Sequence, residues 1–531
     1  MISGDAPNIL TQPNDSLAVR KLDHCRSSGV PLNWLVIGML SFLCVQTASL
    51  LLFLGMGSPL TAISAIGIVF LIWSADINLR KCYGQNPRVS LRVLLVCMVF
   101  SISLFVLGGE GRFLYANTDW QVRGTLLHDL ARYPWPFAYS DTSRGAMILR
   151  APLGMYLIPA GIAKLTGENS ADIWLLLQNS LLLSMILAAG SSFFPTPRQR
   201  WVGLLIFFGF SGMDWIGRLL VGKPLDRHLE QWSMLQYSAH ITQVYWVPQH
   251  CLAGWIGALF YLLWRTNRIS LAVLGSAVPL LALLSPFALI GIIPFALHAG
   301  FSTLWQRKIT IADVVLPLLA GALAIPALLF LTAGSGSVGS RASLPDPIVY
   351  GASLLLEVVL PLIGVFICRR AHIFGYMTSV LMLAALLLIP LGHIGDGADF
   401  VMRASIPSLA ILAVLMAHLL SRPIDTRHQR LAAGLIVAGF AAGLPTPITE
   451  TIRALRFPHA PRPLCNYFGM LPGGSVTYTI PAKNLPDPIR PNTIAIIKSG
   501  NATHCWDGPW PPGQTVGLFD SIPQVPAETY N

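Results

Sequence analysis

Long apolar segments with few charged residues recur along this chain from Leu32 to Leu444. Most are close to the ~20 residues that an α-helix needs to cross a bilayer. The composition agrees, because 54% of the residues are hydrophobic and only 11% are charged. The sequence therefore predicts an all-α polytopic membrane protein.

We expect about thirteen transmembrane helices. They lie at about 32–54, 59–78, 91–109, 171–193, 201–221, 250–265, 269–285, 286–304, 309–332, 348–368, 373–391, 404–420 and 431–447. The first is long enough to span and lacks a small-residue cleavage site, so we interpret it as a retained helix and not as a signal peptide. Ser285-Pro286 divides one long apolar run, where proline predicts a turn or a break.

The positions of the basic residues predict how the chain is oriented in the membrane. With the N-terminus inside, six short connections that each carry at least two Lys or Arg all fall on the inner side, as the positive-inside rule requires. These connections are Arg80-Lys81 to Arg92, Arg198 to Arg200, Arg265 to Arg268, Arg307-Lys308, Arg369-Arg370 and Arg422 to Arg430. No Lys/Arg-rich run is present, so the positive charge does not indicate nucleic-acid binding. The lack of organelle signals favours the cytoplasmic membrane of a bacterium.

This topology divides the chain into a cytoplasmic tail (1–31), a transmembrane domain (32–447) and an extracytoplasmic C-terminal region (448–531). The C-terminal region is rich in Pro and Gly and has two β-like runs, Ser475 to Ile480 and Thr493 to Lys498. Cys465 and Cys505 are its only cysteines, and in an oxidising compartment we expect them to form a disulfide. Two free thiols are the alternative.

The first large outer loop, residues 110–170, carries the leading catalytic candidate, Asp119. An amphipathic segment follows it, with Arg123 and His128 on the polar face as candidate substrate ligands. Ala151 to Leu165 is apolar but too short to span, so we place it along the membrane surface. The alternative for Asp119 is a first-turn acid that pairs with Arg123 at i+4.

A second outer segment, 226–250, ends at the mouth of a span with Trp246, Gln249 and His250. Aromatic rings and amides at such a place are typical of sugar binding. The alternative is an interfacial aromatic belt. A metal site made by His228, His240 and His250 is disfavoured, because their spacing matches no known ligand pattern. We therefore predict no metal ligand, and leave a divalent cation open as a cofactor.

A third outer segment contains His393, Asp399 and Arg403 between two spans. The guanidinium of Arg403, near headgroup depth, is a candidate phosphate ligand. The alternatives are an ion pair with Asp399 or simple snorkelling of the arginine. Arg341, in the Gly/Ser-rich loop from Gly334 to Ser343, is a second candidate for binding substrate.

The order of features around the first loop resembles the GT-C superfamily of integral membrane glycosyltransferases, in particular the protein-mannosyltransferase and aminoarabinose-transferase branch. The resemblance rests on the acidic loop, on Arg-Ala-Pro-Leu-Gly-Met-Tyr-Leu-Ile-Pro at 150–159, on Lys-Leu-Thr-Gly at 164–167, and on the spanning helix and basic turn that follow. This chain has three spans before the loop, where members tend to have one. Its Asp119 also stands alone, where many members have paired acids.

The resemblance implies an enzyme that transfers a sugar from a polyprenyl-phosphate donor to a lipid, glycan or protein acceptor on the outer face, with Asp119 as general base. Three other functions stay open. One is a polysaccharide polymerase or ligase, another is a transporter of lipids or glycans, and the third is a non-catalytic subunit of an envelope assembly.

Overall fold

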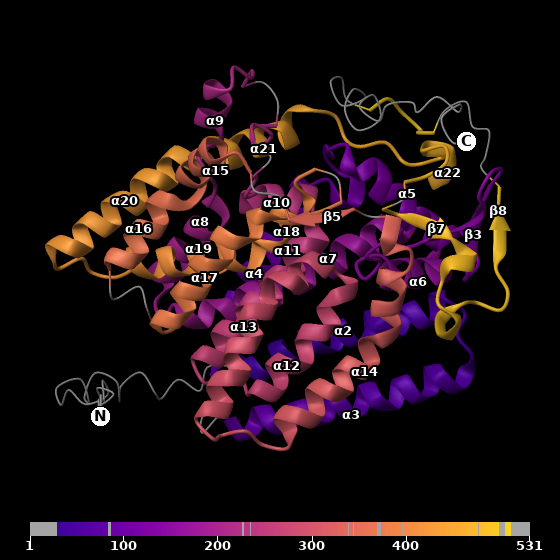
Figure 1. The fold of residues 1–531 in the computed structure, drawn as a ribbon, viewed down its shortest axis with the longest axis horizontal. Coiled ribbons are helices and arrows are strands. Elements are labelled where there is room, and N and C mark those ends of the chain that lie inside the picture. The colour runs from indigo at the N-terminus through magenta and orange to yellow at the C-terminus, as the bar shows by residue number, and fades with distance from the viewer. Residues whose placement is uncertain are drawn as a thin grey trace.

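The computed structural model describes residues 29–82, 87–225, 228–233, 235–337, 339–342, 345–368, 373–395, 397–475, 477–498 and 505–510. Most of the cytoplasmic tail predicted at 1–31, the basic pair Arg369-Arg370 and the end of the C-terminal region lie outside these residues. The described chain is mostly helical, with a few small sheets (Figure 1). This confirms the predicted, mainly helical class of fold.

Eight helical segments of the described chain are long and apolar enough to cross a bilayer. They contain α2 (Leu32–Phe53), α3 (Ser58–Cys82), α7 (Ala171–Gly190), α8 (Pro197–Gly209) with α9 (Asp214–Leu220), α13 (Pro286–Trp305), α14 (Ala312–Thr332), α15 (Pro347–Leu354) with α16 (Leu360–Ile367), and α20 (Arg427–Gly443) with α21 (Pro445–Arg456).

The other predicted spans fall on shorter helices or, for α11, on a less apolar one. These are α4 (Leu91–Leu107), α11 (Pro248–Arg265), α12 (Leu271–Leu280), α17 (Tyr376–Leu388) and α19 (Ile406–Leu420). The 17 residues of α4 rise about 25 Å, somewhat less than a ~30 Å hydrocarbon core. The total of thirteen spans therefore stays a prediction.

The predicted break at Ser285-Pro286 is present. The Ser285 hydroxyl accepts a hydrogen bond from the backbone N–H of Ala288, and α13 begins at Pro286. The Asp313 carboxylate at the start of α14 accepts from the backbone N–H of Ala272 in α12. The beginning of α12 therefore lies beside the turn after α13, and α12 and α13 run antiparallel.

Several basic connections meet at one end of the helix bundle. Arg268 donates to the Ser192 carbonyl at 3.1 Å, and Gln199 donates to the Ser421 carbonyl at 3.5 Å. Arg265 donates to the Phe374 carbonyl at 2.5 Å. These bonds join the ends of α7, α11 and α19 to the starts of α8 and α17.

The first large loop and the C-terminal region share one sheet, in the order β7-β4-β3-β8. The strands are β3 (Phe137–Asp141) and β4 (Gly145–Leu149) from the loop, and β7 (Thr479–Pro481) and β8 (Ala495–Ile497) from the C-terminal region. Figure 1 shows the yellow C-terminal strands beside the purple β3. The sequence predicted strands near β7 and β8, but not the β3–β4 hairpin with which they pair.

Two short sheets complete the fold. β1 (Gly29–Pro31) pairs with β2 (Arg88–Ser90), and β5 (Ser340–Ala342) pairs with β6 (Gly392–Ile394), both antiparallel. The remaining α-helices of the described chain are α5 (Asp119–Arg132), α6 (Leu157–Thr166), α10 (His240–Trp246), α18 (Asp399–Ala404) and α22 (Tyr467–Met470).

The apolar helix predicted at Ala151 to Leu165 is shorter in the structure. It corresponds to α6, which has 10 residues and packs against α2, α5 and α7. Ten residues rise only about 15 Å, so α6 is too short to cross a bilayer. In the C-terminal region, Cys465 and Cys505 form a disulfide.

Candidate functional site

Asp119 is the first residue of α5, and polar contacts fix this helix start. The side chain of Asn117 accepts a hydrogen bond from the Asp119 backbone N–H and donates to the Tyr245 carbonyl at 2.7 Å. Trp120 donates to the same carbonyl at 3.1 Å. The start of α5 is thereby attached to the end of α10.

Arg123, one turn further along α5, donates to the Asp119 carboxylate at 3.2 Å. The i+4 ion pair weighed as the alternative for Asp119 is therefore present. Arg123 is buried, whereas the Asp119 side chain is 25% exposed. Within the described chain, the Nε–H of Arg123 is buried and has no hydrogen-bond acceptor.

Tyr478 lies just before β7, and charged residues of both α5 and α18 act on it. Removal from water raises the pKa of this tyrosine, while nearby Arg123 and Arg403 lower it and nearby Asp119 and Asp399 raise it. All four charged side chains therefore act electrostatically on one half-buried ring. The backbone N–H of Arg150 donates to the Tyr478 carbonyl at 2.7 Å, which fixes this segment against the first loop.

Tyr156 is the second tyrosine of this group. It is buried, and Arg123, Tyr478 and Asp119 act on it electrostatically. Burial is the main reason why its pKa lies above the usual value. We refer to Asp119, Arg123, Tyr156, Asp399, Arg403 and Tyr478 as the Asp119 cluster.

Arg403 forms an ion pair with Asp399 at 2.9 Å inside α18, so that alternative is also present. Its side chain is 18% exposed, and its Nε–H is a second buried donor without an acceptor in the described part of the protein. The cluster thus has two guanidinium groups with spare donors, a feature suited to an anion.

Arg341 and His393 lie directly opposite each other across the β5–β6 pair. Two candidates more than fifty residues apart in the sequence are therefore cross-strand neighbours. The β6 strand leads through the next turn into α18, which carries Asp399 and Arg403.

His250 and Gln249 begin α11 and are buried. The Gln249 amide donates to Nε2 of His250 at 3.2 Å, and Nδ1 of the ring lies 2.7 Å from the Ser285 hydroxyl. With the amide assigned this way, the ring is neutral and donates from Nδ1. Arg123 and Arg403 of the Asp119 cluster act on this ring electrostatically.

His128 has a different environment from the one expected of a substrate ligand. Its Nε2 lies 2.9 Å from the Asp172 carboxylate and its Nδ1 lies 3.2 Å from that of Glu168. These carboxylates raise the histidine pKa against the opposing effect of burial. With both ring nitrogens engaged, His128 attaches α5 to the start of α7.

Trp246 belongs to a separate group of buried polar side chains. Its indole N–H donates to Glu450 at 2.9 Å, its ring lies 4.5 Å from that of His228, and Arg453 lies over its face. The carboxyl groups that accompany it include Glu230 of the same outer segment, but the sequence did not predict that those of other segments would join it. These carboxyl groups are Asp214, Glu230, Glu357 and Glu450, each at most 4% exposed.

The histidines weighed as a metal site have three different sets of partners. His228 contacts Glu450, His250 contacts Ser285, and the ring of His240 lies 2.6 Å from the Phe207 carbonyl. Within the described residues, no group of three or more His, Cys, Asp or Glu side chains is arranged to hold a metal ion.

Comparison with known proteins gives no match to a protein-family model, to a curated protein or to a solved structure.

Proposed function

We propose that this protein is a membrane glycosyltransferase that moves a sugar from a polyprenyl-phosphate donor to an acceptor hydroxyl at the Asp119 cluster. One observation carries the proposal: the partly exposed Asp119 carboxylate pairs with Arg123, and Arg123 and Arg403 each keep a buried Nε–H without an acceptor in the described chain. Charges from these two separate segments also act together on Tyr478. A carboxylate can remove a proton from an acceptor, and guanidinium groups can hold a departing phosphate.

In the proposed reaction, the acceptor oxygen attacks the anomeric carbon of the sugar while the bond from that carbon to the phosphate oxygen breaks. Asp119 takes the hydroxyl proton, and polyprenyl phosphate leaves with the bonding electrons. Such general-base help is worth roughly 10²–10⁴-fold in rate. Arg403 and Arg123 stabilise the phosphate, and a direct displacement inverts the anomeric centre.

The position of the cluster supports a reaction at the outer face. Basic connections meet at the other end of the bundle, which the positive-inside rule assigns to the cytoplasm. We propose the cytoplasmic membrane of a bacterium as the location, with the C-terminal region outside. A lipid-linked donor has its polyprenyl chain in the surrounding membrane.

The experiment measures sugar release from polyprenyl-phosphate sugars by the purified protein and its variants. We expect Asp119→Asn to lower kcat by at least about 10²-fold, the lower end of general-base effects. Asp487→Asn is the matched control, because that carboxylate is 86% exposed and pairs only with its neighbour Arg490 among the described contacts. Full activity of Asp119→Asn removes this carboxylate from catalysis.

Arg403 is tested by donor affinity. Arg403→Gln removes a charge that would contact the phosphate, so we expect the Kd for the donor to rise about tenfold or more. Arg456→Gln, at an exposed position at the end of α21, should leave the Kd unchanged. An unchanged Kd in Arg403→Gln excludes the phosphate role.

The buried carboxyl groups favour a second candidate, a transporter coupled to protons. Asp214 and Glu357 lie within segments apolar enough to span, and ionisable groups at such positions are typical of ion pathways. Proton uptake into proteoliposomes on addition of a lipid-linked sugar, lost in Glu357→Gln, would favour transport. Sugar release with no proton movement favours the transferase.

A further inference from the structure

A second site lies at the opposite end of the bundle from Asp119. The structure contains a cavity of about 320 Å³ between α4, α7, α8, α11 and α19. This volume is within the ~300–1,000 Å³ typical of small-molecule sites. None of the residues of the Asp119 cluster lines it. Since α4 has 17 residues, its cavity end is about 25 Å from the end that leads to the first loop.

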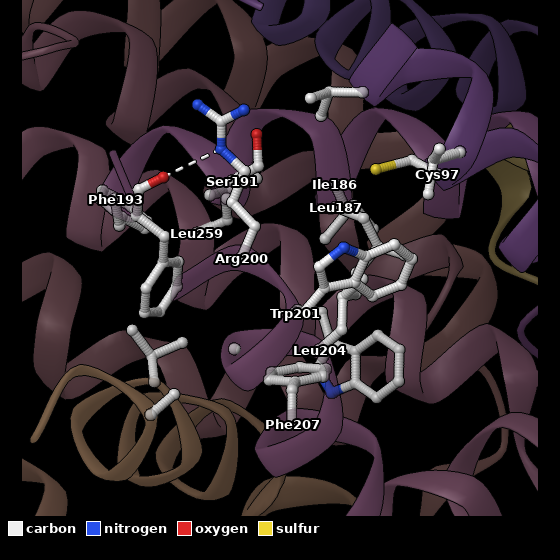
Figure 2. Close-up of a pocket in the computed structure, with 18 of the residues that line it drawn as sticks. Cys97, Ile186, Leu187, Ser191, Phe193, Arg200, Trp201, Leu204, Phe207 and Leu259 are labelled. Atoms are coloured by element: carbon white, nitrogen blue, oxygen red, sulfur yellow. Dashed lines mark hydrogen bonds between the residues drawn. The ribbon is translucent and has the colours of Figure 1, made fainter. Parts of the chain in front are cut away.

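The wall of the cavity is almost entirely apolar. Figure 2 shows Leu204, Phe207 and Leu259 among the side chains that form it. Water is not stable in an apolar cavity, and an empty one loses dispersion contacts along its whole wall. In a membrane, the available apolar material is hydrocarbon chain.

The cavity is accessible from the surface. Trp201, one of its lining residues, is 59% exposed, and Val96 is 42% exposed. Their helices carry further exposed apolar side chains, among them Leu95 and Leu205. A chain could therefore enter sideways from the bilayer between α4 and α8.

The polar lining residues are gathered at one end. They include Arg92, Arg200, Ser90 and Ser191, and the lining contains no acidic residue. Figure 2 shows Arg200 and Ser191 together at the end away from Phe207. Arg200 is held in place by its Nε–H, which donates to the Phe194 carbonyl at 2.9 Å. Two arginines without a neighbouring carboxylate in the described lining are complementary to a phosphate.

We propose that this cavity binds an anionic glycerophospholipid of the cytoplasmic leaflet. One acyl chain fills the apolar cavity, and the lipid phosphate lies against Arg92 and Arg200. The site is separate from the donor site proposed at the Asp119 cluster, because it opens at the end where the basic connections meet. The bound lipid would stabilise the packing of α4, α8 and α19 against α11.

Binding is measured by native mass spectrometry on the delipidated full-length protein, with phosphatidylglycerol as the probe. We expect one tightly bound lipid per chain. Diacylglycerol with the same acyl chains tests the role of the phosphate. Its affinity should be at least about tenfold lower than that of phosphatidylglycerol. Equal binding of both lipids, or preference for polyprenyl phosphate, contradicts the proposal.

Two variants test the two halves of the site. Arg200→Gln should weaken phosphatidylglycerol binding about tenfold, whereas Arg198→Gln, on the same turn but outside the lining, should not. Val414→Phe places a larger side chain into the cavity and should abolish binding. If Val414→Phe does not fold, Ala417→Leu serves the same purpose with a smaller change. Wild-type binding by Arg200→Gln and by a folded cavity-filling variant overturns the assignment.

Discussion

At the scale of single residues, the Asp119 cluster pairs a buried cation with an acid that is partly accessible to solvent. Arg123 is almost completely buried, and a buried cation must be paired to be tolerated. Asp119 pairs with it while 25% of the acid's side chain remains accessible to a substrate. Removing Arg123 would therefore affect both the stability of α5 and the orientation of the proposed base. For this reason Asp119→Asn, which retains the shape of the side chain, is the cleaner test of chemistry.

Asp129, two turns further along α5, supports a prediction about pH. Its carboxylate accepts hydrogen bonds from the Tyr139 hydroxyl at 2.6 Å and from the Tyr467 backbone N–H at 2.8 Å. Burial nevertheless raises the pKa of Asp129 to about 7, whereas an unfolded Asp has a pKa of ~3.9. The folded state therefore favours protonated Asp129. The stability that this residue contributes is fully present below pH ~4 and is lost as the pH rises through about 7.

We expect the Tm of the wild type to fall between pH 5 and pH 8 relative to that of Asp129→Asn, measured in detergent. The corresponding change in unfolding free energy is a few kcal/mol, because one pKa unit is worth about 1.4 kcal/mol. Asparagine keeps an oxygen acceptor for Tyr139 and Tyr467. Asp487→Asn serves as the exposed control. Parallel curves for the wild type and Asp129→Asn would contradict the assignment.

Asp172 supports a second residue-scale prediction. Its carboxylate accepts from Arg112 at 2.9 Å and lies 2.9 Å from the His128 ring, and both partners are nearly buried. Asp172→Ala leaves buried Arg112 without its carboxylate partner and removes one of the two carboxylates at His128, so we expect a loss of about 3–5 kcal/mol in unfolding free energy. Glu168 is the other carboxylate partner of His128, and its side chain is 29% exposed. Glu168→Ala should therefore cost about 1 kcal/mol or less. Equal losses would show that the burial of Asp172 is unimportant.

At the scale of elements, helices were predictable from the sequence and tertiary pairings were not. Apolar runs and the Ser285-Pro286 signal identified the helices and a break between two of them. Asp119–Arg123 and Asp399–Arg403 are i+4 pairs, so local spacing was sufficient to anticipate them. The hairpin β3–β4 was missed because short strands acquire stability from partners elsewhere in the chain, here β7 and β8.

The candidate site shows the same division. Asp119, Arg403 and His250 could be selected as polar groups at the ends of apolar segments. Tyr478 could not, because its place beside them depends on β7 pairing with β4. His128 and Trp246 were expected to bind substrate, but their side chains contact Asp172 and Glu450. The proximity of these carboxyl groups depends on helix packing, which the sequence did not predict.

The disulfide allows a test of the C-terminal element. It joins Cys465, beside α22, to Cys505, beyond β8, across 40 residues. Replacing both cysteines by serine should lower the stability of this region by about 2–4 kcal/mol, because the unfolded segment loses a constraint. Limited proteolysis should then cleave between 465 and 510 at lower protease concentration. A reducing agent should have this effect on the wild type and no effect on the double variant.

At the scale of the whole molecule, the two proposed sites lie at opposite ends of one helical bundle. Helices α4, α7 and α11 line the cavity, and each has one end at a basic connection. The Asp119 cluster depends on the C-terminal region closing over the first loop. The lipid cavity depends only on helix packing. Substitutions at one site should therefore leave binding at the other unchanged.

Sidedness is the assumption that both sites share, and it can be measured directly. Thr142, in the exposed turn between β3 and β4, marks the Asp119 end, and Gln306, in the exposed turn after α13, marks the basic end. Single cysteines are introduced as Thr142→Cys and Gln306→Cys in a chain whose Cys25 and Cys82 are serine, since the free cysteines at 44, 97, 251 and 368 are buried. A maleimide that does not cross membranes should label position 142 in intact cells, and position 306 only after the membrane is permeabilised. Position 306 serves as the control for leakage. The reverse pattern would place Asp119 in the cytoplasm, where a donor presented on the outer face is out of reach, and the transferase proposal would then be wrong.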